Sequence, residues 1–224
     1  MGSIQLVFHY MPLLLKGLRY TILVSVYAIM IALCIGIFLS IVRVSVGSSL
    51  VGKIIKKIIT IYISFVRGTP VLIQIYLIFQ VLSVWGLNLS GFVSGVIALS
   101  LNSGGFMAEI IRGGISAIPK GQIEAGYSLG MSKRKIWTRI ILPQVFKIVL
   151  PQLTSEFINV IKVSPMLSVL ALVELTRTAQ RLVGQTYQTL PFYIAIAVLY
   201  FIVCALLEEL IKLQKRRIMR GQEA

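Results

Sequence analysis

The sequence predicts an all-α integral membrane protein with five transmembrane helices, and three observations carry this prediction. Of the 224 residues, 57% are apolar and 13% are charged, whereas a soluble domain is about half apolar and a quarter charged. The basic residues cluster between long apolar segments. Three such segments carry no charge at all: residues 20–42, 68–108 and 182–207. This composition argues against a water-soluble globule.

The first three spans follow from these uncharged segments, since about 20 apolar residues cross the hydrocarbon core. Residues 20–42 form the first span. Residues 58–84 form the second, interrupted by Arg-Gly-Thr-Pro at residues 67–70. Trp85 begins a polar turn at the depth of the membrane interface. The third span therefore occupies residues 91–111.

The second half of the chain supplies two further spans and two intervening segments. Residues 112–142 are polar and basic, and residues 143–163 form the fourth span. Residues 163–173 are apolar but too short to cross, so we expect a re-entrant or interfacial helix there. Residues 190–210 form the fifth span, and residues 1–224 constitute a single transmembrane domain.

The distribution of basic residues predicts the orientation of the chain. Sixteen of the 22 Lys and Arg lie after the first span, after the third span and in the C-terminal tail. Five lie on the opposite side of the membrane. Because basic loops remain in the cytoplasm, the N-terminus is expected outside and the C-terminus inside. This topology explains most of the net charge of +15 without a nucleic-acid partner.

The cytoplasmic segment between the third and fourth spans has a helix–turn–helix pattern. Residues 121–129 carry apolar side chains at helical spacing, and Gly130 suits the end of that helix. Ser132 suits the N-cap of a second helix, and Pro143 suits the opening of the fourth span. The segment could dock a cytoplasmic partner, lie on anionic lipid or bind DNA, although a third helix for DNA binding is absent.

The same segment resembles the EAA loop of ABC importer permeases. Glu124-Ala-Gly126, Gly130, Ile140 and Leu142-Pro143 stand at the spacing of that motif, with Gly126 in place of the usual alanine. Residues 66–74 and 101–122 are similar to the polar amino acid uptake subgroup, which includes arginine, histidine and glutamine permeases. Residues 162–167 depart from the subgroup by including Pro165.

This resemblance implies a type I ABC importer permease fold in a bacterial plasma (inner) membrane, with multiple passes. Two permease chains, expected to be a homodimer, would form the pore within membrane lipid. Two separate ATPase subunits would dock on the EAA loops and bind ATP and magnesium, so this chain would need no cofactor. An extracellular or periplasmic binding protein would deliver an amino acid. The residues that contact the ATPase would be Glu124, Ala125, Gly126 and Gly130.

The chain has no ATPase site of its own by sequence. Gly47 and Gly52-Lys53 have the spacing of a phosphate loop, but Ile54 follows where a hydroxyl must bind magnesium. The chain also contains no Asp to provide the second magnesium ligand. Energy must therefore come from another subunit or from an ion gradient, and we expect no covalent chemistry.

The substrate site is expected near the broken second span. A helix restarting at Thr69 would direct its free N–H groups at a carboxylate, and Arg67 would add charge or anchor the helix at the cytoplasmic face. Asn102 lies near the middle of the third span. Glu156 lies in the fourth, where an ionisable group is expected to be paired or functional. Asn159 lies one turn further on the same face.

We expect Glu156 to receive the cationic end of the substrate, either its α-amino group or a basic side chain. A structural pair of Glu156 with Lys147 or Lys162 is the alternative. Glu109 and Arg112 are expected to form a gate or a structural pair rather than to bind substrate. No Cys or His spacing predicts a metal site.

The sequence therefore predicts the permease subunit of an ATP-driven importer for a polar, basic amino acid (arginine, lysine or histidine). The alternatives are a gradient-driven secondary carrier, which usually shows an internal repeat, and a membrane-anchored DNA-binding regulator.

Overall fold

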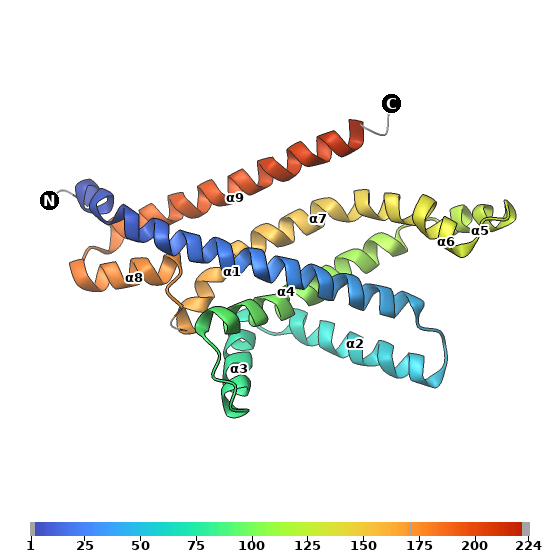
Figure 1. Cartoon of the computed structure of the whole chain (residues 1–224), viewed down its shortest axis with the longest axis horizontal. Helices are drawn as coiled ribbons and strands as arrows, with labels where there is room; N and C mark the ends of the chain where they lie inside the picture. The colour runs from blue at the N-terminus through green and yellow to red at the C-terminus, as the bar shows by residue number, and fades with distance from the viewer. Residues whose placement is uncertain (1–2, 171, 221–224) are drawn as a thin grey trace. The chain divides into compact units, whose positions relative to one another are not determined.

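The computed structural model describes residues 3–170 and 172–220, with side chains described as far as Leu213. Every regular element in this part is helical, which confirms the all-α prediction (Figure 1). Of the basic side chains of the C-terminal tail, only that of Lys212 lies within the described side chains. The elements are α1 (Ser3–Ser45), α2 (Leu50–Gly68), α3 (Val71–Val84), α4 (Gly91–Ser116), α5 (Lys120–Ser128), α6 (Lys133–Ile136), a π-helix (Trp137–Ile141), α7 (Leu142–Val163), a 3-10 helix (Ser164–Leu170), α8 (Leu175–Thr186) and α9 (Thr189–Arg220).

Four of the described helices are long and apolar enough to cross a membrane: Ser3–Ser45, Gly91–Ser116, Lys133–Leu170 and Thr189–Leu213. A fifth span results if α2 and α3, which meet at 119°, count as one broken crossing. The chain therefore has four or five candidate spans, and the predicted five require the broken pair. The orientation of the termini stays a prediction.

The predicted break in the second span lies between α2 and α3. Pro70 disfavours helical geometry at the preceding residue, and Thr69 is extended with φ −122° and ψ 150°. The helix restarts at Val71 rather than at Thr69. Thr69 instead ends α2, where its hydroxyl donates a hydrogen bond of 2.8 Å to the carbonyl of Phe65.

Pro143 does not begin a helix, contrary to the prediction. The helix is continuous from α6 through the π-helix into α7. Proline has no N–H to donate, and its ring crowds the carbonyl four residues earlier. The wider π turn before Pro143 accommodates both the missing hydrogen bond and the ring. The side-chain amide of Gln144 donates to the carbonyl of Ile140 at 2.8 Å, which supplies a donor beside the distorted turn.

The short apolar segment after α7 continues that helix as a 3-10 helix. Pro165 cannot donate to the carbonyl of Ile161, and the hydroxyl of Ser164 donates to it at 2.8 Å instead. After this segment comes α8, an amphipathic helix that the sequence analysis did not predict.

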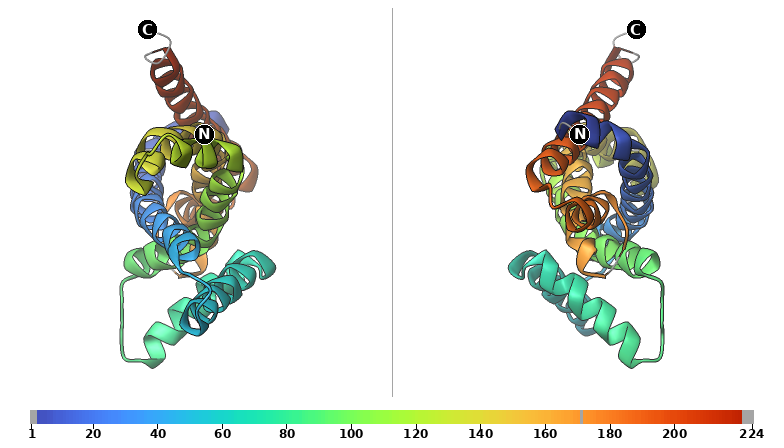
Figure 2. Two further views of the ribbon diagram at one scale, coloured as in Figure 1. Left: turned by 90° about the vertical axis from the view of Figure 1, so that its right-hand side faces the viewer. Right: turned by 90° about the vertical axis from the view of Figure 1, so that its left-hand side faces the viewer.

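The chain divides into two compact units. The first comprises Met1–Ile29, Leu72–Leu99 and Phe157–Ala224. Its core joins α1, α8 and α9, which face the viewer in the right view of Figure 2. The buried side chains of this core are Leu14, Leu175, Ala179, Leu182, Phe192 and Ile196.

The second unit comprises Met30–Val71 and Ser100–Glu156. Its helices approach closely through small residues, as membrane helices commonly do. A Cβ at Gly36 on α1 would lie 2.8 Å from the Cβ of Met107 on α4. Beside it, the hydroxyl of Ser40 donates to the carbonyl of Ala108 at 2.8 Å. This packing fixes α4, which carries Asn102 and Glu109.

Candidate functional site

Two of the predicted substrate residues are buried within the second unit. Glu156 on α7 is 8% exposed, and Asn102 on α4 is 6% exposed. Placing an ionisable group at membrane depth costs about 3 kcal/mol or more, so a buried Glu156 is retained for a structural or functional reason. Asn159 follows Glu156 by three residues on α7 and is exposed, so that its amide is accessible.

Arg67 belongs to a different part of the second unit. It lines a cavity of about 460 Å³ together with Arg43 and Glu109. Neither Glu156 nor Asn102 is among the described residues that line this cavity. The structure thus groups Arg67 with a charged cluster at the ends of α1 and α4.

That cluster contains the predicted pair of Glu109 and Arg112. The Arg112 guanidinium donates to the Glu109 carboxylate at 2.7 Å and 3.0 Å. Arg43 also donates to this carboxylate and completes a group of two cations around one anion. Arg43 was not predicted at this site, because the approach of α1 to α4 brings it there from 66 positions away. The pair is confirmed, and its third member is new.

Replacing Glu109 with Gln is expected to destabilise the protein by about 2 kcal/mol. The substitution leaves two partly buried cations without their counter-ion. The expected loss of stability lies between the loss from breaking a surface ion pair and the loss from breaking a buried one. The measurement is the thermal unfolding midpoint in detergent. The control is Glu208→Gln, which removes an exposed carboxylate paired with Lys212 on α9 and should cost well under about 1 kcal/mol. Equal shifts for both variants would contradict the prediction.

The predicted helix–turn–helix is present as α5, a tight turn and α6. Gly130 has a φ of 71°, a left-handed conformation that glycine adopts without strain. Its N–H donates to the carbonyl of Tyr127 at 2.9 Å, and the N–H of Met131 donates to that of Gly126 at 3.0 Å. These two bonds form the turn that commonly ends a helix at glycine. Ser132 stands at the N-cap of α6, as predicted.

The four residues that the resemblance assigned to ATPase contact differ in exposure. Glu124, Ala125 and Gly130 are exposed, whereas Gly126 is buried. A Cβ at Gly126 would lie 3.0 Å from the Cγ1 of Ile136. Gly126 therefore allows α5 to pack on α6, and only the other three residues are accessible to a partner.

Two exposed apolar residues in the same segment were given no role in partner contact from the sequence. Tyr127 is 53% exposed and Leu129 is 81% exposed. They lie beside the exposed Glu124 and Ala125 on α5 and its turn. Large apolar side chains exposed together outside the spans are typical of a protein interface.

A second buried carboxylate, Glu174, lies in the first unit and was assigned no role from the sequence. It is fully buried and caps α8, where it accepts N–H groups from Thr176 at 2.7 Å and Arg177 at 2.6 Å. The Tyr200 hydroxyl on α9 donates to it at 3.0 Å. Burial raises the pKa of Glu174 above its ordinary value of 4.5, and these hydrogen bonds oppose the shift. The carboxylate thus joins α8 to α9.

The raised pKa makes the contribution of Glu174 to stability depend on pH. The folded state binds a proton at this site more tightly than the unfolded state. The contribution is therefore complete below about pH 4.5 and is lost as the pH rises through the folded pKa. Relative to Glu174→Gln, the wild type should become more stable as the pH falls from 7 to 5. Thermal unfolding of both proteins measures this, and a difference independent of pH would contradict it.

Comparisons with known proteins identify the family to which the chain is similar. Residues 32–220 match the family described as "Binding-protein-dependent transport system inner membrane component". The L-cystine transport system permease protein TcyB of Bacillus subtilis is 36% identical over 93% of this chain and 88% of its own length. The arginine transport system permease protein ArtQ of the same organism is 33% identical, covering 92% of this chain and 93% of its own length.

Solved structures give the same result. A crystal structure of an amino acid ABC transporter with histidines matches with a TM-score of 0.87 and 38% identity. The match covers 97% of this chain and 99% of the other chain. An inward-facing methionine ABC transporter, MetNI, matches with a TM-score of 0.75 at 18% identity, over 93% of this chain and 97% of the other. The latter similarity shows the fold alone.

Proposed function

Because this chain belongs to the family of binding-protein-dependent transport system inner membrane components, we propose that it forms the path of a basic amino acid through a bacterial inner membrane. It is a multi-pass membrane protein and a permease subunit of an amino acid ABC importer. The family implies ATPase partners and a dimer of permease chains. Neither a gradient-driven carrier nor a DNA-binding regulator is supported by these matches.

The choice of a basic substrate depends on one observation, the buried carboxylate of Glu156. At 8% exposure on α7, this side chain lies where a cationic ligand group would compensate the cost of burial. Asn102, also buried, would add a hydrogen bond to the ligand. Backbone N–H groups near Thr69, at the break that follows α2, would hold the substrate carboxylate. Asn159 would line the path one turn beyond Glu156.

The relatives support the amino acid class more broadly. Their printed substrates include cystine and arginine, and a putative permease of Rickettsia conorii that is 37% identical is described for glutamine. All these molecules share an α-amino and an α-carboxyl group. Glu156 would then bind the α-amino group of any of them. For a basic substrate, Glu156 would alternatively bind the side chain of arginine, lysine or histidine.

Coupling to ATP hydrolysis is proposed for the α5–α6 hairpin. Glu124, Ala125 and Gly130 present an exposed surface, and Gly126 holds the two helices together. The ATPase subunits would bind ATP and magnesium, and an external binding protein would deliver the substrate. The cytoplasmic placement of the hairpin follows from the predicted orientation with the N-terminus outside.

The test is the substrate-stimulated ATPase activity of the complete importer in liposomes, with its ATPase and binding protein. Arginine, lysine and histidine are expected to stimulate hydrolysis several-fold and to accumulate in the vesicles. Stimulation by glutamine or cystine but not by the basic amino acids would overturn the substrate proposal and leave the permease assignment intact.

A further inference from the structure

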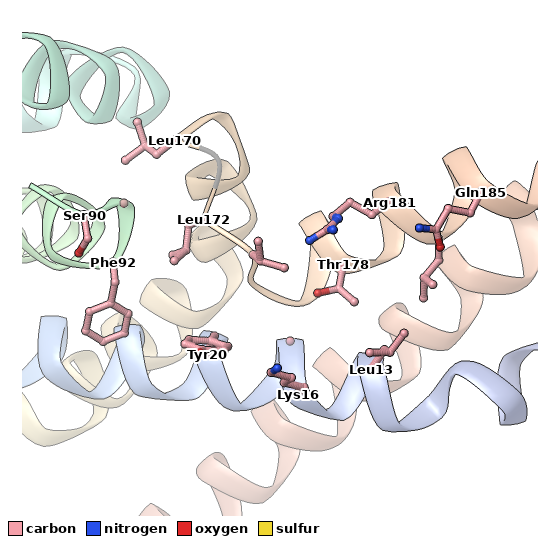
Figure 3. Close-up of a pocket in the computed structure, with 14 residues that line it drawn as sticks. Leu13, Lys16, Tyr20, Ser90, Phe92, Leu170, Leu172, Thr178, Arg181 and Gln185 are labelled. Carbon is pink, nitrogen blue, oxygen red and sulfur yellow. The ribbon is translucent and has the colours of Figure 1, made fainter.

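A cavity of about 670 Å³ lies in the first unit, between the first half of α1, the start of α4 and α8. Its wall combines apolar side chains such as Tyr20 and Phe92 with polar ones. Lys16 extends toward it from α1 and Arg181 from α8, with Thr178 between them (Figure 3). The proposed transport path and the coupling hairpin use none of these residues.

The cavity carries two positive charges, and none of the described residues that line it is a carboxylate. Within the part of the chain that the structure describes, neither Lys16 nor Arg181 forms an ion pair. The carboxylate on the adjoining loop, Glu174, is buried and already accepts backbone N–H groups at the start of α8. The two cations are therefore available to an anionic ligand.

Close packing brings these two cations onto one cavity. Gly17 on α1 follows Lys16, and a Cβ at Gly17 would lie 2.5 Å from the Oγ1 of Thr178 on α8. A larger residue at position 17 would separate the two helices. Since Lys16 precedes this contact and Arg181 lies one turn beyond Thr178, both cations reach the same space.

The position of the cavity along α1 indicates the kind of ligand. Lys16 and Arg19 immediately precede the uncharged residues 20–42, and basic side chains at the end of a span lie at the level of lipid headgroups. Leu13 and Tyr20 in the cavity wall are 48% and 40% exposed, so this chain leaves part of the apolar wall uncovered. A ligand that covers this wall must combine an anionic group with an apolar part.

We propose that this cavity binds the headgroup of an anionic phospholipid. The phosphate lies between the Lys16 ammonium and the Arg181 guanidinium, whose planar donors suit phosphate oxygens. The glycerol and the first acyl carbons lie against Tyr20, Phe92 and Leu170. A free phosphate would leave these apolar side chains uncovered, and an acidic protein segment would have no acyl chain to place on the uncovered part of the wall.

Native mass spectrometry of the complete transporter tests this proposal, with phosphatidylglycerol, phosphatidylcholine and inorganic phosphate as separate probes. Phosphatidylglycerol should bind, and Lys16→Gln with Arg181→Gln should weaken its binding by about tenfold or more, since two charge-assisted contacts are lost. The matched control is Arg19→Gln with Arg177→Gln, which removes the same charges from the same helices outside the cavity. It should leave binding unchanged, and Lys16→Arg should retain it.

Three results would overturn the proposal. If the cavity variant and the control variant lost phosphatidylglycerol equally, the lipid would bind through general charge. If both variants retained it equally, the lipid would bind elsewhere. Equal binding of phosphatidylcholine, or competition by inorganic phosphate at similar concentration, would show that an anionic lipid is not selected. Crosslinking of Arg181 to the binding protein in place of lipid would assign the cavity to an acidic protein surface.

Discussion

Glu156→Gln is expected to lower the apparent affinity for arginine by roughly 30-fold, which corresponds to about 2 kcal/mol for a charge-assisted contact. The substitution keeps the shape of the side chain and removes its charge. If Glu156 binds a basic side chain, arginine and lysine uptake should fall more than glutamine uptake. If Glu156 binds the α-amino group, the uptake of all amino acids should fall alike. Uptake of radiolabelled amino acids into liposomes that contain the complete importer measures both patterns.

The control for this substitution is Glu208→Gln, which removes an exposed carboxylate on α9. It should leave affinity and selectivity unchanged. If Glu156 is instead a structural partner of Lys147 or Lys162, Glu156→Gln should lower the unfolding midpoint while the remaining folded protein keeps its substrate affinity. Unaltered affinity and selectivity would exclude Glu156 from the substrate site.

Tyr127→Ser combined with Leu129→Ser is expected to release the ATPase subunits. The two side chains are 53% and 81% exposed on the hairpin, and burying one large apolar side chain contributes about 1.5–3 kcal/mol. Losing both should weaken association by more than about tenfold and abolish substrate-stimulated hydrolysis. Co-purification of the ATPase with the tagged permease, followed by the coupled ATPase assay, measures this effect.

Leu50→Ser is the matched control, because Leu50 is 76% exposed at the start of α2 and lies on the side of the membrane predicted to be cytoplasmic. It should leave co-purification unchanged. Gly126→Val is a complementary variant. It should weaken association by separating α5 from α6, since its Cβ would press on Ile136. Wild-type ATPase retention in the Tyr127 and Leu129 double variant would show that the hairpin does not carry the interface.

The features that depend on local chemistry were predictable from residues alone. Pro70 predicts the break in the second span because proline restricts the residue before it, and the break is present. Gly130 predicts the turn of the cytoplasmic hairpin because glycine adopts left-handed geometry without strain, and its φ is 71°. The helix count carried less information, since a bent pair can be one crossing or none.

Several local signals were overridden by the continuity of helices. Pro143 has the sequence signature of a helix start, yet a π turn carries the helix through it. The helix α8 was not predicted, although Leu175, Ala179 and Leu182 stand at helical spacing. The structure shows that these side chains pack with Leu14 on α1 and Phe192 on α9. Helix stability comes largely from such packing rather than from intrinsic preference.

Residue composition and spacing were enough to predict that this chain is helical, that it resides in a membrane and that it resembles an amino acid importer permease. Hydrophobic length and motif spacing are local properties, so they can be read along the chain. Which charged residues lie together follows from the three-dimensional packing of the helices. This packing joined Arg43 to Glu109 across 66 positions, buried Glu174 beneath Tyr200 and placed Lys16 and Arg181 on one cavity. Contacts between distant residues depend on how helices pack, and no spacing along the chain specifies that packing.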